Sequence, residues 1–472
     1  MRLSRSLLAT VIWGMLPMAQ ALATPADTHA RLLVENALIF SPQVDGDRPF
    51  LGYMEVAADG SISRIGQGRP PAIHANQRID AQGFWLLPGF VSAHSHLWQS
   101  GFSGIAPNQG LQGWIDELYG VEAKKLGAYE LYLLSQQGAF NHLNNGITSV
   151  FNFTYTGSDE SGLVDRCQLR GALDSGLRVV HGLNVRTVGS EWTAEQAYRR
   201  AVDFLDWAQG QPERGLYLKT MLAGTAAYDG MPAEQMAVEA RLMRELELGN
   251  QQHYLESPAL AEGEAARYGA FKQAGMIGPG MIFGHFIHST PAIAADAAAS
   301  GVAMSWNPLS NGRLGSGMAD VLAYRKLGMK IGMGVDGEAS ADRADPFENM
   351  RMGLYQVRAS AQDAAAMSAE EVWHLHTLGS AEVLGIDHLV GSLEVGKRAD
   401  FMLLNPKEFT PYHDAYAALV FAAGVENIHS LYVDGVQVRQ RDTDARRLNA
   451  CLSPAPGGLR QTESAPPAPP AG

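Results

Sequence analysis

His94 and His96 stand two positions apart at the end of an apolar run. Alternate residues of a β-strand face the same side, so both imidazoles can project from one face of a strand. Neutral imidazole is a common ligand of Zn²⁺ and similar ions. Taken alone the pair is a weak motif, because two histidines at this spacing also arise by coincidence.

Other groups that could bind a metal or move protons close later apolar runs: His253, Glu256, His285 and Asp336. A buried carboxylate is costly without a partner, so Asp336 predicts a cation nearby. A carboxyl group beside a metal-bound water can move protons, which is the role we expect for Glu256. Glu256 and His253 have opposite strand parity, so Glu256 must lie where its strand breaks. The structural alternatives are an exposed Glu256 at a strand end and His285 as a hydrogen-bonded core residue.

Eight strand-like apolar runs alternate with helix-like segments along the middle of the chain. The runs are at 86–96, 146–153, 177–185, 216–224, 251–257, 281–288, 301–308 and 329–336, and three of the clearest helical segments are at 193–209, 232–249 and 318–328. Strand and helix repeated eight times is typical of a (β/α)8 TIM barrel, whose active site lies at the carboxyl ends of the strands. We therefore expect an α/β protein with its barrel at 89–385. A doubly wound open sheet is the alternative, although no GxGxxG motif follows the first run.

The two ends of the chain differ from the middle. Residues 24–88 and 386–450 consist of short β pieces, which predict a small β-sandwich domain built from both chain ends. Residues 1–23 carry Arg2 and Arg5, then an apolar run, then Ala-Leu-Ala. They predict a secretory signal peptide and a periplasmic or secreted protein, with an N-terminal membrane anchor as the alternative. The Pro-rich residues 451–472 predict a disordered tail.

The amino-acid composition excludes some classes of protein. The 472 residues are 46% hydrophobic and 18% charged with a net charge of −13, which excludes a mainly disordered chain and disfavours a nucleic-acid partner. No later window is apolar enough for an integral membrane segment after processing. The two cysteines, Cys167 and Cys451, could pair in an oxidising compartment, but neither has the CxxC neighbour of a thiolate metal site.

The joint pattern resembles the amidohydrolase superfamily, and more narrowly its cytosine deaminase, S-adenosylhomocysteine deaminase and triazine hydrolase branch. The motifs are LLPGFVSAHSHLWQ, HYLESP, MSWNPLSNGRLGSG, GMGVDGEAS and GSLEVGKRADFMLL. The resemblance implies one divalent metal, zinc or sometimes iron, bound by His94, His96, His253 and Asp336. It implies that Glu256 and Asp336 are catalytic proton carriers and that His285 lies near the metal-bound water. It also implies a small-molecule substrate and, by analogy, a homodimer.

Further residues are candidates for substrate contact. The resemblance places the loop with Asn307, Ser310 and Asn311 after the seventh strand, near the substrate. Aromatic side chains near the expected mouth could stack a planar ring, namely Trp98, Trp114, Phe153, Tyr228 and Trp306.

Four further positions bear on the substrate and on the number of metals. Many deaminases of this branch have a histidine where this chain has Thr225, and an arginine where it has Ser103, so adenosine and S-adenosylhomocysteine are in doubt as substrates. Other branches use a carboxylated lysine to bridge two metals, and Lys219 lies in the matching run but deeper than a bridging ligand should. His181, in the third run, could also face inward, although we favour a structural role.

We therefore predict a metal-dependent hydrolase of non-peptide C–N bonds that deaminates a nitrogen heterocycle. The alternatives are amide or carbon–halogen hydrolysis at the same site, and a ligand-binding barrel without catalysis.

Overall fold

The computed structural model describes residues 29–438, apart from 43–45, 47, 156–158, 160, 187–192, 212–214 and 229. The predicted signal peptide, the predicted tail and Cys451 lie outside the described residues. Among those described, no helix combines the length and the apolar character that a membrane crossing requires. Cys167 is buried in helix α4.

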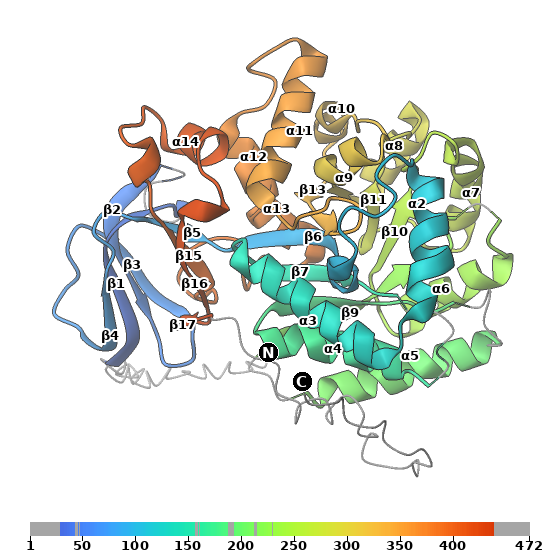
Figure 1. Cartoon of the computed structure of the whole chain (residues 1–472), viewed down its shortest axis with the longest axis horizontal. Coiled ribbons are helices and arrows are strands. Elements are labelled where there is room, and N and C mark those ends of the chain that lie inside the picture. Colours follow the sequence, from blue (N-terminus) through green and yellow to red (C-terminus); the bar gives the residue numbers. More distant parts are fainter. Residues whose placement is uncertain are drawn as a thin grey trace, which may run out of the picture.

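The predicted barrel is present, and each of the eight apolar runs contributes to its sheet (Figure 1). All neighbouring strands of this sheet are parallel. In chain order they are β6 (Phe90–His96), β7 (Ile147–Phe153), β8 (Arg178–Leu183), β9 (Tyr217–Gly224), β10 (Asn250–Tyr254), β11 (Met281–His285), β12 (Ala303–Trp306), β13 (Ile331–Met333) and β14 (Asp336–Gly337).

The eighth run is split into β13 and β14, and this split closes the barrel. β13 pairs with β12, whereas β14 crosses to the first strand, where Asp336 lies opposite Ser95. Gly334 sits at the crossing because a Cβ there would come 2.7 Å from the Cβ of His94. Asp336 takes a left-handed backbone with φ 59°, which costs free energy and is typical of functional sites.

Helices pack around the barrel strands and at the ends of the barrel (Figure 1). They are α2 (Leu111–Glu117), α3 (Ala128–Asn144), α4 (Leu163–Ser175), α5 (Ala194–Gln209), α6 (Ala233–Glu245), α7 (Ala261–Gln273), α8 (Pro291–Ala299), α9 (Pro308–Arg313), α10 (Val321–Lys326), α11 (Pro346–Ala361), α12 (Ala369–Leu375) and α13 (Leu378–Leu384). Short helical turns η1 (Leu97–Gly101), η2 (Leu118–Glu122) and η3 (Ala123–Lys125) flank α2.

The three helices expected from the sequence are all present; α5 has the expected ends, and the other two are shorter than expected. α5 begins where predicted because Thr193 caps it and forms a capping box with Gln196. α6 ends at Glu245, four residues early, because Glu247 adopts a positive φ of 53°. α10 begins only after Asp320, whose side chain accepts the Ala323 N–H as an N-cap.

Both chain ends build the second sheet, as predicted. Its strands are β1 (His29–Ile39), β2 (Phe50–Val56), β3 (Ile62–Gln67), β4 (His74–Asp80), β5 (Trp85–Pro88), β15 (Phe401–Leu404), β16 (Ile428–Val433) and β17 (Val436–Gln437). The order is β17-β16-β15-β5-β1-β2-β3, with β4 also pairing β1. Between β15 and β16 lie η4 (Lys407–Phe409), α14 (Ala415–Phe421) and η5 (Val425–Asn427). Figure 1 shows the strands from the two chain ends side by side, next to the barrel.

A buried ion cluster joins the barrel to this second sheet. Arg178 of β8 is 1% exposed and donates to both carboxylate oxygens of Asp400, at 2.5 and 2.9 Å, and also to Asp434. Asp400 precedes β15 and Asp434 follows β16, so one guanidinium holds two turns of the second sheet against the barrel.

Arg178→Ala is expected to lower the free energy of unfolding by about 3–5 kcal/mol, because it leaves the buried carboxylate of Asp400 without its cation, whereas Asp434 keeps Arg398. Urea denaturation measures the effect. Arg199→Ala is the matched control, since Arg199 forms an exposed helical pair with Glu195 and its loss should cost only about 0.5 kcal/mol. Equal losses in the two variants would contradict the role given to Arg178.

Candidate active site

The two histidines of the first strand point their Nε2 atoms at a common point. His94 Nδ1 lies against the side-chain oxygen of Gln251, and His96 Nδ1 is 3.1 Å from the backbone oxygen of Phe153. Both partners are acceptors, so each Nδ1 carries the proton and each Nε2 presents a bare lone pair. The two Nε2 atoms are nevertheless only 3.1 Å apart.

His253 and Asp336 complete this group from distant parts of the chain. The Nε2 of His253, at the end of β10, lies 3.2 Å from that of His96. One carboxylate oxygen of Asp336 lies 3.3 Å from the Nε2 of both His94 and His96. Burial alone would raise the pKa of Asp336, but its close contacts with His94 and His96 hold that pKa well below its usual value, so Asp336 is ionised. Burial and the neighbouring imidazoles lower the pKa of His253, which keeps that ring neutral.

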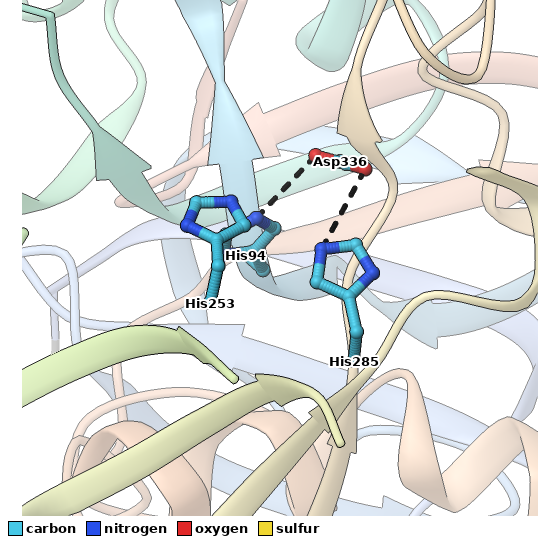
Figure 2. A group of neighbouring side chains, drawn as sticks. All are labelled: His94, His253, His285 and Asp336. Carbon is cyan, nitrogen blue, oxygen red and sulfur yellow. Dashed lines mark ion pairs between the residues drawn. The ribbon is translucent and has the colours of Figure 1, made fainter. Parts of the chain in front are cut away.

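This donor set fits a divalent cation. Two atoms bound to one Zn²⁺ at ~2.0–2.1 Å lie roughly 3.3 Å apart in a tetrahedron, close to the separations seen here. Lone pairs that face each other in a buried place repel unless a positive charge lies between them, so the geometry calls for an ion. His94, His253, His285 and Asp336 also each offer one ligand atom within 4.8 Å of the others. Figure 2 shows these four side chains facing one another. With His96, five side chains therefore converge, and His285 Nε2 lies 3.9 Å from Asp336, further than the Nε2 atoms of His94 and His96.

Glu256 reaches the same point because β10 breaks directly before it. Leu255 has a left-handed backbone with φ 56°, which turns the chain and overrides the strand parity of Glu256. The Glu256 side chain is buried, and one of its oxygens lies 3.6 Å from His285 Nε2. Burial, and then the charge of Asp336, raise the pKa of Glu256 to about 8. Its carboxyl group can therefore keep a proton near neutral pH, as a general acid must.

His285 is held by the loop after the seventh strand. Its Nδ1 donates to the side-chain oxygen of Asn311 at 2.7 Å, and the amide of Asn307 lies 3.3 Å from its Nε2. Ser310 donates to the backbone oxygen of Asn307. Asn307, Ser310 and Asn311 were predicted to contact substrate. They are instead buried behind His285, outside the cavity lining, and they fix the tautomer and orientation of its ring.

A cavity of about 330 Å³ opens directly onto these groups. His96, His253, Glu256, His285 and Asp336 line its floor. Aromatic walls come from Trp114, Tyr119, Phe153, Tyr155 and Tyr228, and apolar walls from Leu111, Ile115, Met231, Leu260 and Leu314. A planar, largely uncharged small molecule suits such a lining.

Most of the chain matches a known protein family. The model of the Amidohydrolase family matches residues 85–438, about three quarters of the chain. The chain belongs to the amidohydrolase family. The predicted family, the predicted barrel and the predicted class of metal-dependent hydrolase are confirmed, and the site holds a set of ligands for a divalent metal.

Similar proteins carry deaminase and hydrolase names. A 5-methylthioadenosine/S-adenosylhomocysteine deaminase of Desulforudis audaxviator is 29% identical over 443 residues, which cover 89% of this amidohydrolase and 99% of the relative. An adenosine deaminase of Xanthomonas campestris, solved with zinc, has a TM-score of 0.77 at 22% identity and 90% and 97% coverage. A mutant of atrazine chlorohydrolase from Arthrobacter aurescens TC1, solved with zinc and atraton, has a TM-score of 0.78 at 19% identity and 89% and 99% coverage.

Two tryptophans that were predicted to contact the substrate of this amidohydrolase lie away from the cavity. Trp98 and Trp306 are fully buried and do not line the cavity. Trp98 stacks behind Tyr155 with ring centroids 5.2 Å apart, and Tyr155 takes the place at the cavity wall. Trp306 packs against Gly353 of α11 in the core. The sequence alone could not tell whether these two side chains would face the cavity or be buried in the core.

Four other positions considered in the sequence have different surroundings. Thr225 lines the cavity, and its N–H is bonded to Glu239. Ser103 donates to the backbone of Asp342 rather than facing the cavity. His181 stacks on Phe204 of α5, on the outer side of the barrel. Lys219 lies near the start of β9 beside Gly385, at the end opposite the histidines, so it bridges no metal there.

Arg186, which the sequence analysis did not single out, also lines the cavity. It is the only Arg or Lys among the described lining residues. It follows β8 by three positions, and that location at the carboxyl end of a barrel strand was the signal that could have found it.

Proposed function

We propose that this amidohydrolase is a zinc-dependent deaminase of a nitrogen heterocycle. The observation that carries the proposal is the protonatable, buried Glu256 beside the His–Asp cluster at the floor of an aromatic-walled cavity. A binding protein would have no use for such a proton carrier. The deaminase names of relatives that align over nearly their whole length support the same reaction.

The protonation state of each residue at the site determines its role in the proposed reaction. His94, His96, His253 and Asp336 would hold the ion, which when bound supplies a nucleophilic water near neutral pH. Asp336, ionised, accepts a proton from that water. Glu256 gives its proton to the ring nitrogen next to the attacked carbon, which relieves the negative charge that develops there. His285, whose Nδ1 proton is held by Asn311, presents its Nε2 lone pair to the same place. The departing amine takes the proton that Asp336 accepted and leaves as ammonia, while the proton of the new hydroxyl group returns to Glu256.

The cavity supports a purine-like ring with an uncharged substituent. The aromatic walls can stack the ring, and the apolar wall can cover a substituent next to it. Because Arg186 is the only lining Arg or Lys described, a multiply charged substrate such as a nucleotide is disfavoured.

We propose a periplasmic or secreted location and, by analogy, a homodimer. The location is supported by the two arginines, apolar run and Ala-Leu-Ala sequence of residues 1–23. Cell fractionation of the full chain and light scattering of the purified protein test these two statements.

An ammonia-release screen tests the reaction. The zinc-loaded protein is offered 5-methylthioadenosine, S-adenosylhomocysteine, adenosine, guanine and an aminotriazine, with chloride release from atrazine and amide cleavage measured in parallel. We expect metal-dependent ammonia release from at least one heterocycle. If no heterocycle releases ammonia but atrazine releases chloride or an amide is cleaved, the protein is not a deaminase and catalyses that other hydrolytic reaction.

A further inference from the structure

A chain of buried polar side chains runs behind the metal ligands, from helix α3 to the closing point of the barrel. It consists of His142 on α3 and of Ser95 and Ser92 on β6, and all three are at most 1% exposed. The Ser95 and Ser92 hydroxyl oxygens are 2.8 Å apart, and Ser95 Oγ is 3.0 Å from His142 Nε2. At the other end, Ser92 Oγ accepts the N–H of Val335 at 3.1 Å.

The tautomer of His142 fixes the direction of the hydrogen bond at one end of this chain. His142 Nδ1 faces the backbone oxygen of Gly138 at 2.7 Å and must donate to it. Burial lowers the pKa of His142 to about 4, so the ring is neutral and its Nε2 is an acceptor. Ser95 therefore donates to His142, and the hydroxyl proton of Ser92 has two acceptors, the Ser95 oxygen and the backbone oxygen of His94 at 2.9 Å. This arrangement leaves a lone pair of Ser92 for the Val335 N–H.

Val335 is the residue at which the barrel strand changes partner. It lies between β13 and β14, outside both strands, and it directly precedes Asp336. Its N–H is bonded to the Ser92 side chain rather than to a neighbouring strand. Ser95 in turn lies between His94 and His96 and opposite Asp336 in the sheet. The same chain thus contacts the backbone of His94 through Ser92, and its members lie next to His94, His96 and Asp336 in the sequence or in the sheet.

We propose that Ser92, Ser95 and His142 are positioning residues that set the place of Asp336 relative to His94 and His96. They touch neither the ion nor the cavity. They act by replacing the strand hydrogen bond that is lost where the barrel closes, which fixes the left-handed turn that aims the Asp336 carboxylate. Supports of this kind typically contribute on the order of 10- to 100-fold to metal affinity.

Ser92→Ala tests the proposal, with Ser149→Ala as the matched control. Ser149 on β7 is equally buried, but its hydroxyl has no partner among the described residues. Two readouts are taken on the metal-free proteins: zinc affinity by competition with a chromophoric chelator, and the visible spectrum after Co²⁺ is added. Thermal unfolding of the metal-free proteins records any loss of stability separately.

For Ser92→Ala we expect a zinc affinity about 10- to 100-fold weaker than that of Ser149→Ala and a changed Co²⁺ spectrum. An unchanged affinity and spectrum would overturn the proposal, whatever the unfolding temperature, because the chain would then serve stability alone. Should Ser92→Ala fail to fold, Ser95→Ala decides by the same readouts. It keeps the Val335 bond but removes the link to His142, and we expect a smaller loss of about 10-fold in affinity.

Discussion

Glu256→Gln should lose about 10²- to 10⁴-fold in turnover while it keeps its metal. Glutamine has nearly the shape of glutamate, so the buried side chain can stay in place next to His285. An amide, however, can neither give up a proton at neutral pH nor take one back. Steady-state ammonia release, together with zinc content by mass spectrometry, measures the two effects separately.

The control for this variant is Glu338→Gln. Glu338 follows Asp336 by two positions and is also buried with a raised pKa, of about 7, because of its burial. Its carboxylate accepts two bonds from Asn141 and does not line the cavity. We expect Glu338→Gln to retain turnover within about tenfold. A Glu256→Gln variant that turns over at the rate of this control would remove Glu256 from the mechanism.

Removal of the metal is the second change with a large expected effect. Dialysis against a chelator should abolish ammonia release, and added zinc should restore it. The same treatment should lower the unfolding temperature, because zinc at about 1,000 times its dissociation constant contributes about 4 kcal/mol to the folded state. Differential scanning calorimetry with and without chelator measures this shift.

Variants at histidines show whether the lost metal belongs to this site. His94→Ala should copy the effect of the chelator in the wild-type protein. His288→Ala should not, because His288 Nε2 is bonded to the backbone of Ser316 and does not line the cavity. Lys219→Ala should retain one zinc per chain. A chelated protein with full activity and an unchanged unfolding temperature would contradict the metal-dependent account.

The sequence predicted the parts of this molecule that depend on periodicity and strand ends. Eight apolar runs were sufficient for the barrel, and the strand positions of His94, His96 and His253 were sufficient to bring them together, because parallel strands end at one face. The β pieces at both ends likewise predicted the shared second sheet.

The sequence could not predict features that depend on local backbone turns or on how deeply a side chain is buried. The turn at Leu255 that brings Glu256 to the site, and the crossing at Gly334 that delivers Asp336, are left-handed or tightly packed positions without a periodic signal. Trp98 and Trp306 were placed at the mouth because they are large and aromatic, yet close packing against Tyr155 and Gly353 buries them. Asn307 and Asn311 illustrate the same limit, since they reach the site only through His285.

X-ray diffraction at the zinc absorption edge, on crystals of the zinc-loaded protein, tests the central claim most directly. We expect one anomalous peak per chain, at about 2.0–2.2 Å from the Nε2 atoms of His94, His96 and His253 and from a carboxylate oxygen of Asp336. A peak elsewhere, or two peaks bridged by another residue, would contradict it.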